Sequence, residues 1–462
     1  MTNELGLFGT TALLALVSAV GSAVLGYPAG NWLASTSPRV RSALSPILLL
    51  PFLLPPFLIG ISLLPLQRDV DSNIGMLWII AAHLLMNIGF VARVVASLAV
   101  PKEQLEAAEL DRATGLQRRL LIELPQQLPG ISAAGLLIAL YSATSYGLVL
   151  SLGRGQVETL ETEIAFRALR ELDLSGAALL ALLQTLLTIA MFLAANRLGA
   201  NPTDLFSSQS ASGSTTGAVI GVGILAATGY LVWSIASRAI SLNGGLLNNI
   251  AALGSQGSRD ILNVTVLQAS ANSIRNVLVA LVIALPVAWF AAGLSKSNVI
   301  WLLPIGISPV VLGLVVLVLS GYFPTQLNGW WLLPITQSVF LIPLAYQILR
   351  PARAALPSEY LESAALDGAS KASVFRLIEL PVLARPIATA TAFAALGGLG
   401  EFGAASFLAY GSQNTLPLAV FRLAGRPGPE NLGMAMTASL LFVGLALVVV
   451  YLIAREAGRK SR

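Results

Sequence analysis

Residues 101–115 are Pro101-Lys-Glu-Gln-Leu-Glu106-Ala-Ala-Glu-Leu-Asp111-Arg-Ala-Thr-Gly115, and the chain continues to Ile122-Glu-Leu-Pro125. Residues 357–369 repeat the pattern as Pro357-Ser-Glu-Tyr-Leu-Glu362-Ser-Ala-Ala-Leu-Asp367-Gly-Ala and continue to Ile378-Glu-Leu-Pro381. Aligned without a gap, 14 of the 31 residues in 101–131 are identical to those in 357–387. Composition alone would give about two or three identities, so this segment is duplicated.

The duplication extends beyond this segment. The same offset of 256 residues continues downstream, and an offset of 253 applies upstream. The pairs are Tyr146 with Phe402, Pro51 with Pro304, Pro56 with Pro309, and Gly60 with Gly313. We therefore expect two homologous modules, 1–199 and 217–462. The Ser/Gly/Thr-rich segment 200–216 between them has too little apolar surface to fold, and we interpret it as a cytoplasmic linker.

The composition is that of a membrane protein. Of the 462 residues, 56% are hydrophobic and 11% charged, with a mean hydropathy of +0.79, whereas soluble domains are roughly one-quarter charged. A membrane-spanning helix needs roughly 20 apolar residues. The sequence predicts an all-α, polytopic protein with about eleven such helices, at 7–33, 43–65, 76–98, 130–152, 175–198, 217–239, 268–292, 298–320, 330–350, 386–410 and 431–454.

The charge distribution predicts the orientation. The first six residues carry Glu4 and no basic residue, unlike a cleavable signal peptide, so we expect the first helix to be retained with its N terminus outside. That orientation places most Lys and Arg residues, from Arg39 to Arg462, on the cytoplasmic side, in accordance with the positive-inside rule. Because these residues are spread over short loops, nucleic acid is not an expected partner.

Several chemistries are excluded by composition. The chain has no Cys, so it forms no disulfide and no thiolate or Cys-based metal site. It contains no Gly-x4-Gly-Lys-Ser/Thr phosphate-binding loop, so ATP hydrolysis requires another chain. The single histidine, His83, lies in an apolar run, which favours a packed core residue over a functional one.

Each copy of the duplicated segment predicts a short surface helix. It is rich in Ala and Leu with acidic residues toward its start, and after a turn a Leu-Pro opens the next membrane helix. The copies differ where Arg112 replaces Gly368, a position that favours a permissive backbone. The alternative is that the acids only cap helices and solvate a loop.

This pattern resembles the EAA loop of type I ABC importer permeases, with Glu-Ala-Ala, then Asp-Gly-Ala, then Ile-x-Leu-Pro, and the resemblance covers essentially the whole chain. It implies a multi-pass permease of a prokaryotic cell membrane that performs no covalent chemistry and binds no cofactor. Two copies of a separate ATPase subunit would hold ATP and magnesium, and an extracytoplasmic binding protein would deliver the solute. The resemblance assigns ATPase coupling to Glu106, Ala107, Ala108, Asp111, Gly115, Glu362, Ala364, Asp367 and Gly368. It also implies that the Arg112 copy docks differently from the Gly368 copy.

The pathway is expected where polar or broken backbone enters the membrane. Glu401 in Gly-Leu-Gly400-Glu401-Phe-Gly403 either lines the pathway and meets a cation or bonds to a neighbouring helix, and Ser145 is its counterpart. Proline-broken segments around Pro55 and Pro309 line the pathway or are plain kinks. Arg93 is expected to extend to the membrane surface.

The outer segments favour a branch of the family. Segments 155–164 and 415–426 either contact the delivery protein or pack as loop helices. Together with Gly-Glu-Phe-Gly-Ala they look like the fused permeases for thiamine and ferric iron, which implies thiamine or its phosphates slightly ahead of iron. Alternatives are related permeases for another solute, an ion-gradient-driven secondary transporter, and a membrane scaffold without transport.

Overall fold

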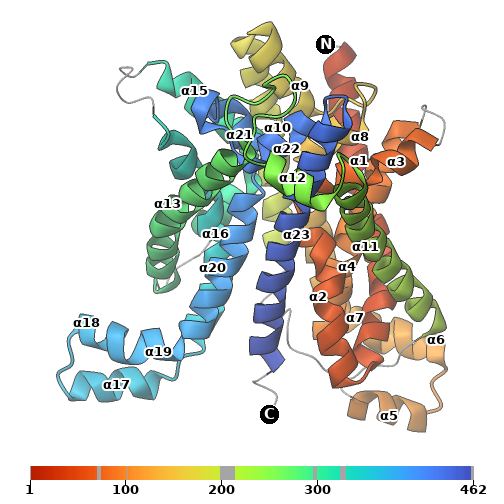
Figure 1. The fold of residues 1–462 in the computed structure, drawn as a ribbon. Helices are drawn as coiled ribbons and strands as arrows, with labels where there is room; N and C mark the ends of the chain where they lie inside the picture. Colours follow the sequence, from red (N-terminus) through yellow and green to blue (C-terminus); the bar gives the residue numbers. More distant parts are fainter. Residues whose placement is uncertain are drawn as a thin grey trace.

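The protein is helical throughout the part that the structure describes (Figure 1). A computed structural model describes residues 2–69, 74–100, 102–197, 214–294, 299–322 and 329–458. Within these ranges, seven helices are long and apolar enough to cross a membrane, and four bent pairs bring the number of candidate spans to eleven. The predicted class and span number are therefore confirmed. Residues 200–213 of the predicted linker lie outside the described residues. The next helix begins at Thr215, within the predicted linker.

The first half is built around a long helix that packs against two others. Helix α1 (Thr2–Ser35) contacts α4 (Gly75–Ser97) and α7 (Leu124–Ala143). The remaining elements of this half are α2 (Pro38–Leu53), α3 (Pro56–Asp69), α5 (Lys102–Leu110), α6 (Gly115–Arg118), η2 (Arg119–Glu123), α8 (Tyr146–Leu152), α9 (Leu160–Phe166), η3 (Arg167–Glu171) and α10 (Leu174–Arg197).

The second half repeats this order after an additional helix, α11 (Thr215–Ser241), and the short α12 (Leu246–Ala252). Helix α13 (Val266–Ala292) packs against α16 (Leu332–Ala354) and α20 (Ala384–Leu399), as α1 packs against α4 and α7. The others are α14 (Val299–Leu302), η4 (Leu303–Gly306), α15 (Pro309–Ser320), α17 (Ser358–Leu366), α18 (Lys371–Val374), η6 (Phe375–Glu379), α19 (Leu380–Val382), α21 (Gly403–Leu408), η7 (Gly411–Gln413), α22 (Leu416–Ala424) and α23 (Pro429–Gly458).

Two predicted spans are broken at matching places. Helices α2 and α3 meet at 92°, and the corresponding α14–η4 and α15 meet at 96°. Proline has no backbone N–H and disfavours a helical residue before it, so Pro55-Pro56 and Pro309 end one segment and start the next. In the second break, the Ser308 hydroxyl accepts hydrogen bonds from the backbone N–H groups of Val310 and Val311 and caps α15. The spans predicted at 43–65 and 298–320 are therefore not single straight helices.

The span predicted at 130–152 is also bent, by 59°, between α7 and α8. In the second half, a bend of 75° separates α18–α19 from α20, and α20 ends at Leu399 before α21 begins. The prediction of one helix over 386–410 is therefore wrong, because glycines and Glu401 interrupt it.

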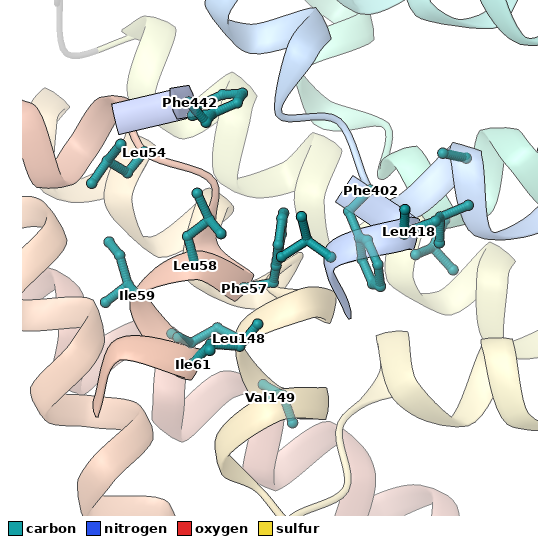
Figure 2. Close-up of a cluster of buried hydrophobic side chains, with 14 of the residues drawn as sticks. Leu54, Phe57, Leu58, Ile59, Ile61, Leu148, Val149, Phe402, Leu418 and Phe442 are labelled. Atoms are coloured by element: carbon teal, nitrogen blue, oxygen red, sulfur yellow. The ribbon is translucent and has the colours of Figure 1, made fainter. Parts of the chain in front are cut away.

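The two halves interlock. The last helix of the first half, α10, packs against η4 of the second half, where the Thr188 hydroxyl donates to the carbonyl oxygen of Gly306. The last helix of the second half, α23, packs against α2 of the first half. One apolar core joins both halves, and Figure 2 shows Phe57 and Leu148 of the first half near Phe402 and Leu418 of the second.

Arg93 corrects a prediction. Its side chain is only 3% exposed, and its Nη1 donates to Ser45 Oγ at 2.8 Å. The guanidinium lies between α4 and α2 inside the first half, because this face of α4 is covered by protein. It does not extend to the membrane surface as expected.

Close helix approach in the first half depends on Gly89. A Cβ at this position would lie 1.9 Å from the carbonyl oxygen of Leu48 in α2, so the two backbones would have to separate. Gly135 on α7 has no atom within 4 Å of such a Cβ.

We expect Gly89→Ala to destabilise the protein by about 1–3 kcal/mol through overpacking. Gly135→Ala is the matched control, and it is expected to be neutral or slightly stabilising because Ala favours the helix. Thermal unfolding of the purified proteins, followed by size-exclusion chromatography, measures both. Equal melting temperatures for the two variants would contradict this packing.

Candidate functional site

The duplicated segments form two matching loops at one end of the molecule. Helices α5 and α17 lie at the end of the molecule where the C-terminal helix α23 ends, opposite the N terminus (Figure 1). Two positions after the last residue of each helix, the backbone is left-handed. Arg112 has a φ of 56° and Gly368 has a φ of 72°. The prediction that this position favours a permissive backbone is confirmed. In the first loop an arginine adopts the left-handed conformation that a glycine adopts in the second.

The repeat extends to the hydrogen bonds of the next turn. Thr114 and Ser370 cap α6 and α18 through their side chains. A π-helix follows at η2 and at η6, in which the N–H of Leu124 bonds to the Arg119 oxygen and the N–H of Leu380 to the Phe375 oxygen. The proline after each leucine has no N–H to donate, which accounts for the wide turn at the Leu-Pro step.

The predicted coupling residues divide into two groups by exposure. Ala108 and Ala364 are buried, at 6% and 7% exposed, and hold each helix against its own loop. The predicted residues at the surface are Glu106, Ala107, Asp111, Gly115, Glu362, Asp367 and Gly368.

Two leucines missed by sequence analysis stand out at this surface. Leu110 is 86% exposed and its repeat partner Leu366 is 90% exposed, at the last position of α5 and α17. Apolar side chains this exposed, repeated beside a carboxylate in both loops and outside the long helices, are candidates for contact with another protein. Their identity in both copies was visible in the sequence, but only the structure shows that they point outward.

The two loops are held by different ion pairs. In the first loop, Arg118 lies 2.6 Å from Glu109 and 3.3 Å from Glu123, all within the loop. In the second loop, Glu379 lies 2.8 Å from Arg353 of α16, and the Arg353 guanidinium stacks 4.7 Å from the Trp289 ring of α13. The second loop is therefore fastened directly to two membrane helices.

A cavity of about 350 Å³ lies between the halves. Its walls include the breaks of both modules, the middle of α4 and α16, and the C-terminal ends of α7 and α20. Ser145, Pro309 and Glu401 line it, so the structure brings together three of the four predicted pathway residues. Pro55, the fourth, does not line the cavity but packs against Gly400, which does. A Cβ added to Gly400 would lie 2.8 Å from the Cγ of Pro55.

Glu401 and Ser145 occupy equivalent places but make different contacts. The carboxylate of Glu401 accepts hydrogen bonds from the backbone N–H groups of Ala404, at 2.6 Å, and Ala405, at 3.1 Å, at the start of α21. Glu401 thus lines the cavity while its carboxylate caps α21, the next helix of the chain. Ser145 precedes α8 in the same way, yet its buried hydroxyl makes no hydrogen bond to any described residue.

His83 and Gln337 also reach the cavity, one from each half. His83 is 2% exposed, and its Nδ1 lies 3.2 Å from Ser18 Oγ while its Nε2 has no partner among the described residues. Gln337 donates from Nε2 to the Gly398 oxygen at 3.4 Å, and its Oε1 is likewise unpaired within the described part of the chain. His83 is buried, as expected of a packed core residue, but the sequence did not predict that it would line a cavity.

Aromatic rings cover the cavity on the side of α22. Phe402 lies 5.5 Å from both Phe57 and Tyr146 of the first half and 5.1 Å from Phe421 of α22, measured between ring centroids. Figure 2 shows Phe57 and Phe402 facing one another across the junction. Tyr146 and Phe402 are repeat partners, so the two modules meet here through equivalent residues.

The outer segments fold as helices that are partly packed into the core. Thr159 caps α9 through its side chain, and Leu160 and Ile164 are fully buried. In α22, Leu418 and Leu423 are buried while Arg426 beyond its end is exposed. Among the described residues, no group of three or more His, Cys, Asp or Glu could hold a metal ion.

Known proteins share this sequence pattern over both halves. Thiamine transport system permease protein ThiP of Salmonella typhimurium is 25% identical over 432 residues, covering 85% of this chain and 75% of ThiP. ThiP of Brucella abortus is 25% identical over 410 residues, covering 83% and 72%. YvgM of Bacillus subtilis, whose name assigns it to molybdenum transport, is 24% identical over 195 residues, covering 38% of this chain and 86% of YvgM.

The family described as binding-protein-dependent transport system inner membrane component matches residues 22–204 and again 271–457. These two regions contain the repeated helices, both duplicated loops and the walls of the cavity. The chain is therefore a multi-pass inner-membrane protein that belongs to the family of binding-protein-dependent transport system inner membrane components, with the family's unit present twice.

Proposed function

We propose that this chain is the complete membrane pathway of an ATP-driven importer. The observation that carries the proposal is the pair of matching loops, α5–η2 and α17–η6, which lie at the same end of the molecule and which we assign to the cytoplasmic side. As a permease component the chain is not itself an enzyme, and two copies of a separate ATPase would dock on these loops. A binding protein outside would deliver the solute to the face formed by α9 and α22.

The chemistry of the loop surface supports docking of a protein. Asp111 and Asp367 follow the C-terminal ends of α5 and α17, where the helix dipole disfavours negative charge, so they do not stabilise their own helices. Each lies beside an exposed leucine, Leu110 or Leu366. An apolar anchor beside a carboxylate is suited to a partner with an apolar pocket and a basic rim.

The repeat supports assigning one loop to each module, 1–199 and 217–462, with 200–216 as the connection. A fused chain would fix the ratio of two docking loops to one pathway. An ion pair with Arg353 fastens the second loop to α16, whereas a hydrogen bond from Gln126 of α7 to Gln104 of α5 ties the first loop, and we propose that the loops therefore transmit force unequally.

For the solute we propose thiamine or its phosphates. The support is the coverage of both ThiP relatives, together with a cavity that has aromatic walls and one carboxylate. Ferric iron has less support, because the described residues provide no three-ligand cluster.

We further propose that the aromatic cluster of Phe57, Tyr146, Phe402 and Phe421 closes the cavity toward the outside. Its rings come from both halves, so separating the halves at this point would open the pathway. ATP-driven closure of the partner subunits would supply that movement through the loops.

We expect Leu110→Ser and Leu366→Ser to weaken ATPase docking by about tenfold or more each, because a buried leucine contributes roughly 1.5–3 kcal/mol. Co-purification of the ATPase subunit at increasing dilution measures this. Leu247→Ser, at an 81% exposed leucine on α12, is the control and should retain the ATPase fully. Retention at the wild-type level in both loop variants would refute docking at this surface.

Replacing Glu362 and Asp367 together with Ala is expected to impair ATPase docking and transport while leaving membrane insertion intact, because both side chains are exposed. Charged hydrogen bonds of about 1.5–3 kcal/mol each correspond to a loss of at least tenfold. The control replaces Glu158 and Glu171, which are exposed on the opposite side of the protein, and it is scored on ATPase docking alone because both residues flank α9. Unchanged transport in the loop double variant would contradict the assignment.

Phe402→Leu is expected to increase leakage of thiamine from preloaded proteoliposomes in the absence of ATP severalfold, because it removes a ring shared by three aromatic contacts. Phe90→Leu is the matched control, since Phe90 is also buried and stacked but lies within the first half. Equal leakage from both variants would place the closure elsewhere.

A further inference from the structure

We propose that the cavity is itself a selective binding site, for a small organic solute that is neutral or cationic, and that it excludes oxyanions. This inference rests on the proposed function, because it concerns the same pathway. It adds that the permease, and not only the delivery protein, selects the solute. The recognising groups are His83, Ser145 and Gln337.

Four buried polar groups at the cavity wall lack hydrogen-bond partners among the described residues. They are His83 Nε2, Ser142 Oγ, Ser145 Oγ and Gln337 Oε1, on side chains that are 2%, 3%, 6% and 3% exposed. Leaving such groups unpaired is costly in an apolar interior, so a solute or water must satisfy them. Their chemistry is mixed: Gln337 Oε1 accepts, Ser145 can donate or accept, and His83 offers either role according to its tautomer.

The charge of the wall argues against an anion. Among the lining residues there is no Lys or Arg, and the only carboxylate is Glu401. A multiply charged oxyanion needs basic side chains or several free backbone N–H groups to replace its hydration. The N–H groups at the start of α21 would be the obvious donors, but Glu401 already occupies those of Ala404 and Ala405.

The size and shape of the cavity suit a small ring compound. About 350 Å³ falls at the lower end of the range for small-molecule sites. Phe52 lines it with its ring centroid 6.2 Å from that of Tyr141, and Phe57 and Tyr146 form the outer side. Flat aromatic walls with a few hydrogen-bonding groups favour a planar heterocycle over a spherical ion.

Both halves contribute to recognition. His83 and Ser145 belong to the first half, and Gln337 and Glu401 to the second. A solute that bonds to both sides is held only while the halves are close together. Occupancy of the site is therefore linked to the movement that opens the pathway.

The relatives make this inference open to test. YvgM is named for molybdenum transport, and PhnU of Salmonella typhimurium, 32% identical over 136 residues that cover 28% of this chain and 48% of PhnU, is named for 2-aminoethylphosphonate transport. Direct transfer of either name would predict an anion-binding cavity here. The wall of this cavity predicts the opposite.

The experiment measures binding of radiolabelled thiamine to the complete permease–ATPase complex in lipid nanodiscs, with molybdate and 2-aminoethylphosphonate as competitors. We expect saturable thiamine binding and no competition by either anion at a hundredfold excess. His83→Leu, Gln337→Leu and Ser145→Ala are each expected to weaken thiamine binding about three- to tenfold, the effect of one neutral hydrogen bond. The matched control is Ser22→Ala, because the Ser22 hydroxyl is also buried and unpaired among the described residues but does not line the cavity.

Competition by either anion, absence of saturable thiamine binding, or equal affinities in Ser145→Ala and Ser22→Ala would each overturn the proposal. ATPase co-purification and ATP-dependent uptake are measured on the same preparations. If these fail in the wild-type complex, the proposed function is wrong. If they succeed while the cavity variants bind thiamine like the wild type, only the selective site is wrong.

Discussion

A lipid bilayer offers no hydrogen bonds to a broken helix, so interrupted backbone must be covered by protein or face a water-filled cavity. This constraint explains how the two halves are joined. The break between η4 and α15 is covered by α10 of the first half, where Thr188 bonds to Gly306, and α2 is covered by α23 of the second half. Each module thus completes the membrane-embedded surface of the other, and the cavity forms where the two breaks meet.

The same constraint limits where polar side chains can lie. Arg93 is paired with Ser45 inside one module, and Glu401 is held by the N-terminal N–H groups of α21. The polar groups that remain unpaired within the described residues at the cavity are His83 Nε2, Ser142 Oγ, Ser145 Oγ and Gln337 Oε1. Because these groups border a cavity, solute recognition is a use that fits their position.

Sequence reasoning found the features that repeat or that have a local cause. The duplicated segments, the eleven spans, the proline breaks and the left-handed backbone at Arg112 all follow from residue type and spacing. It failed where the answer depends on a distant segment. Whether Arg93 reaches the membrane surface depends on α2, and whether His83 borders a cavity depends on distant residues of α16 and α20, such as Gln337 and Phe393. Similarly, periodicity did not reveal Gln337, because a single polar residue in an apolar helix gives no sign of which half it faces.

The duplicated architecture would connect the two duplicated loops mechanically to the aromatic closure that we propose. In the first half, α7 starts at the end of the loop and finishes just before Ser145 and Tyr146. In the second half, α20 starts after the loop and finishes just before Glu401 and Phe402. With 20 and 16 residues, these helices span about 30 and 24 Å, enough to carry a tilt of each loop across the membrane as a rigid rod. Because both rods end at repeat-equivalent rings that stack on each other, opposite tilts of the two loops would separate Tyr146 from Phe402 and widen the cavity at one point. In the second half, force from the loop would pass through the 75° bend before α20, which lies beside the Arg353–Glu379 ion pair. In the first half, α7 continues from its loop without such a bend.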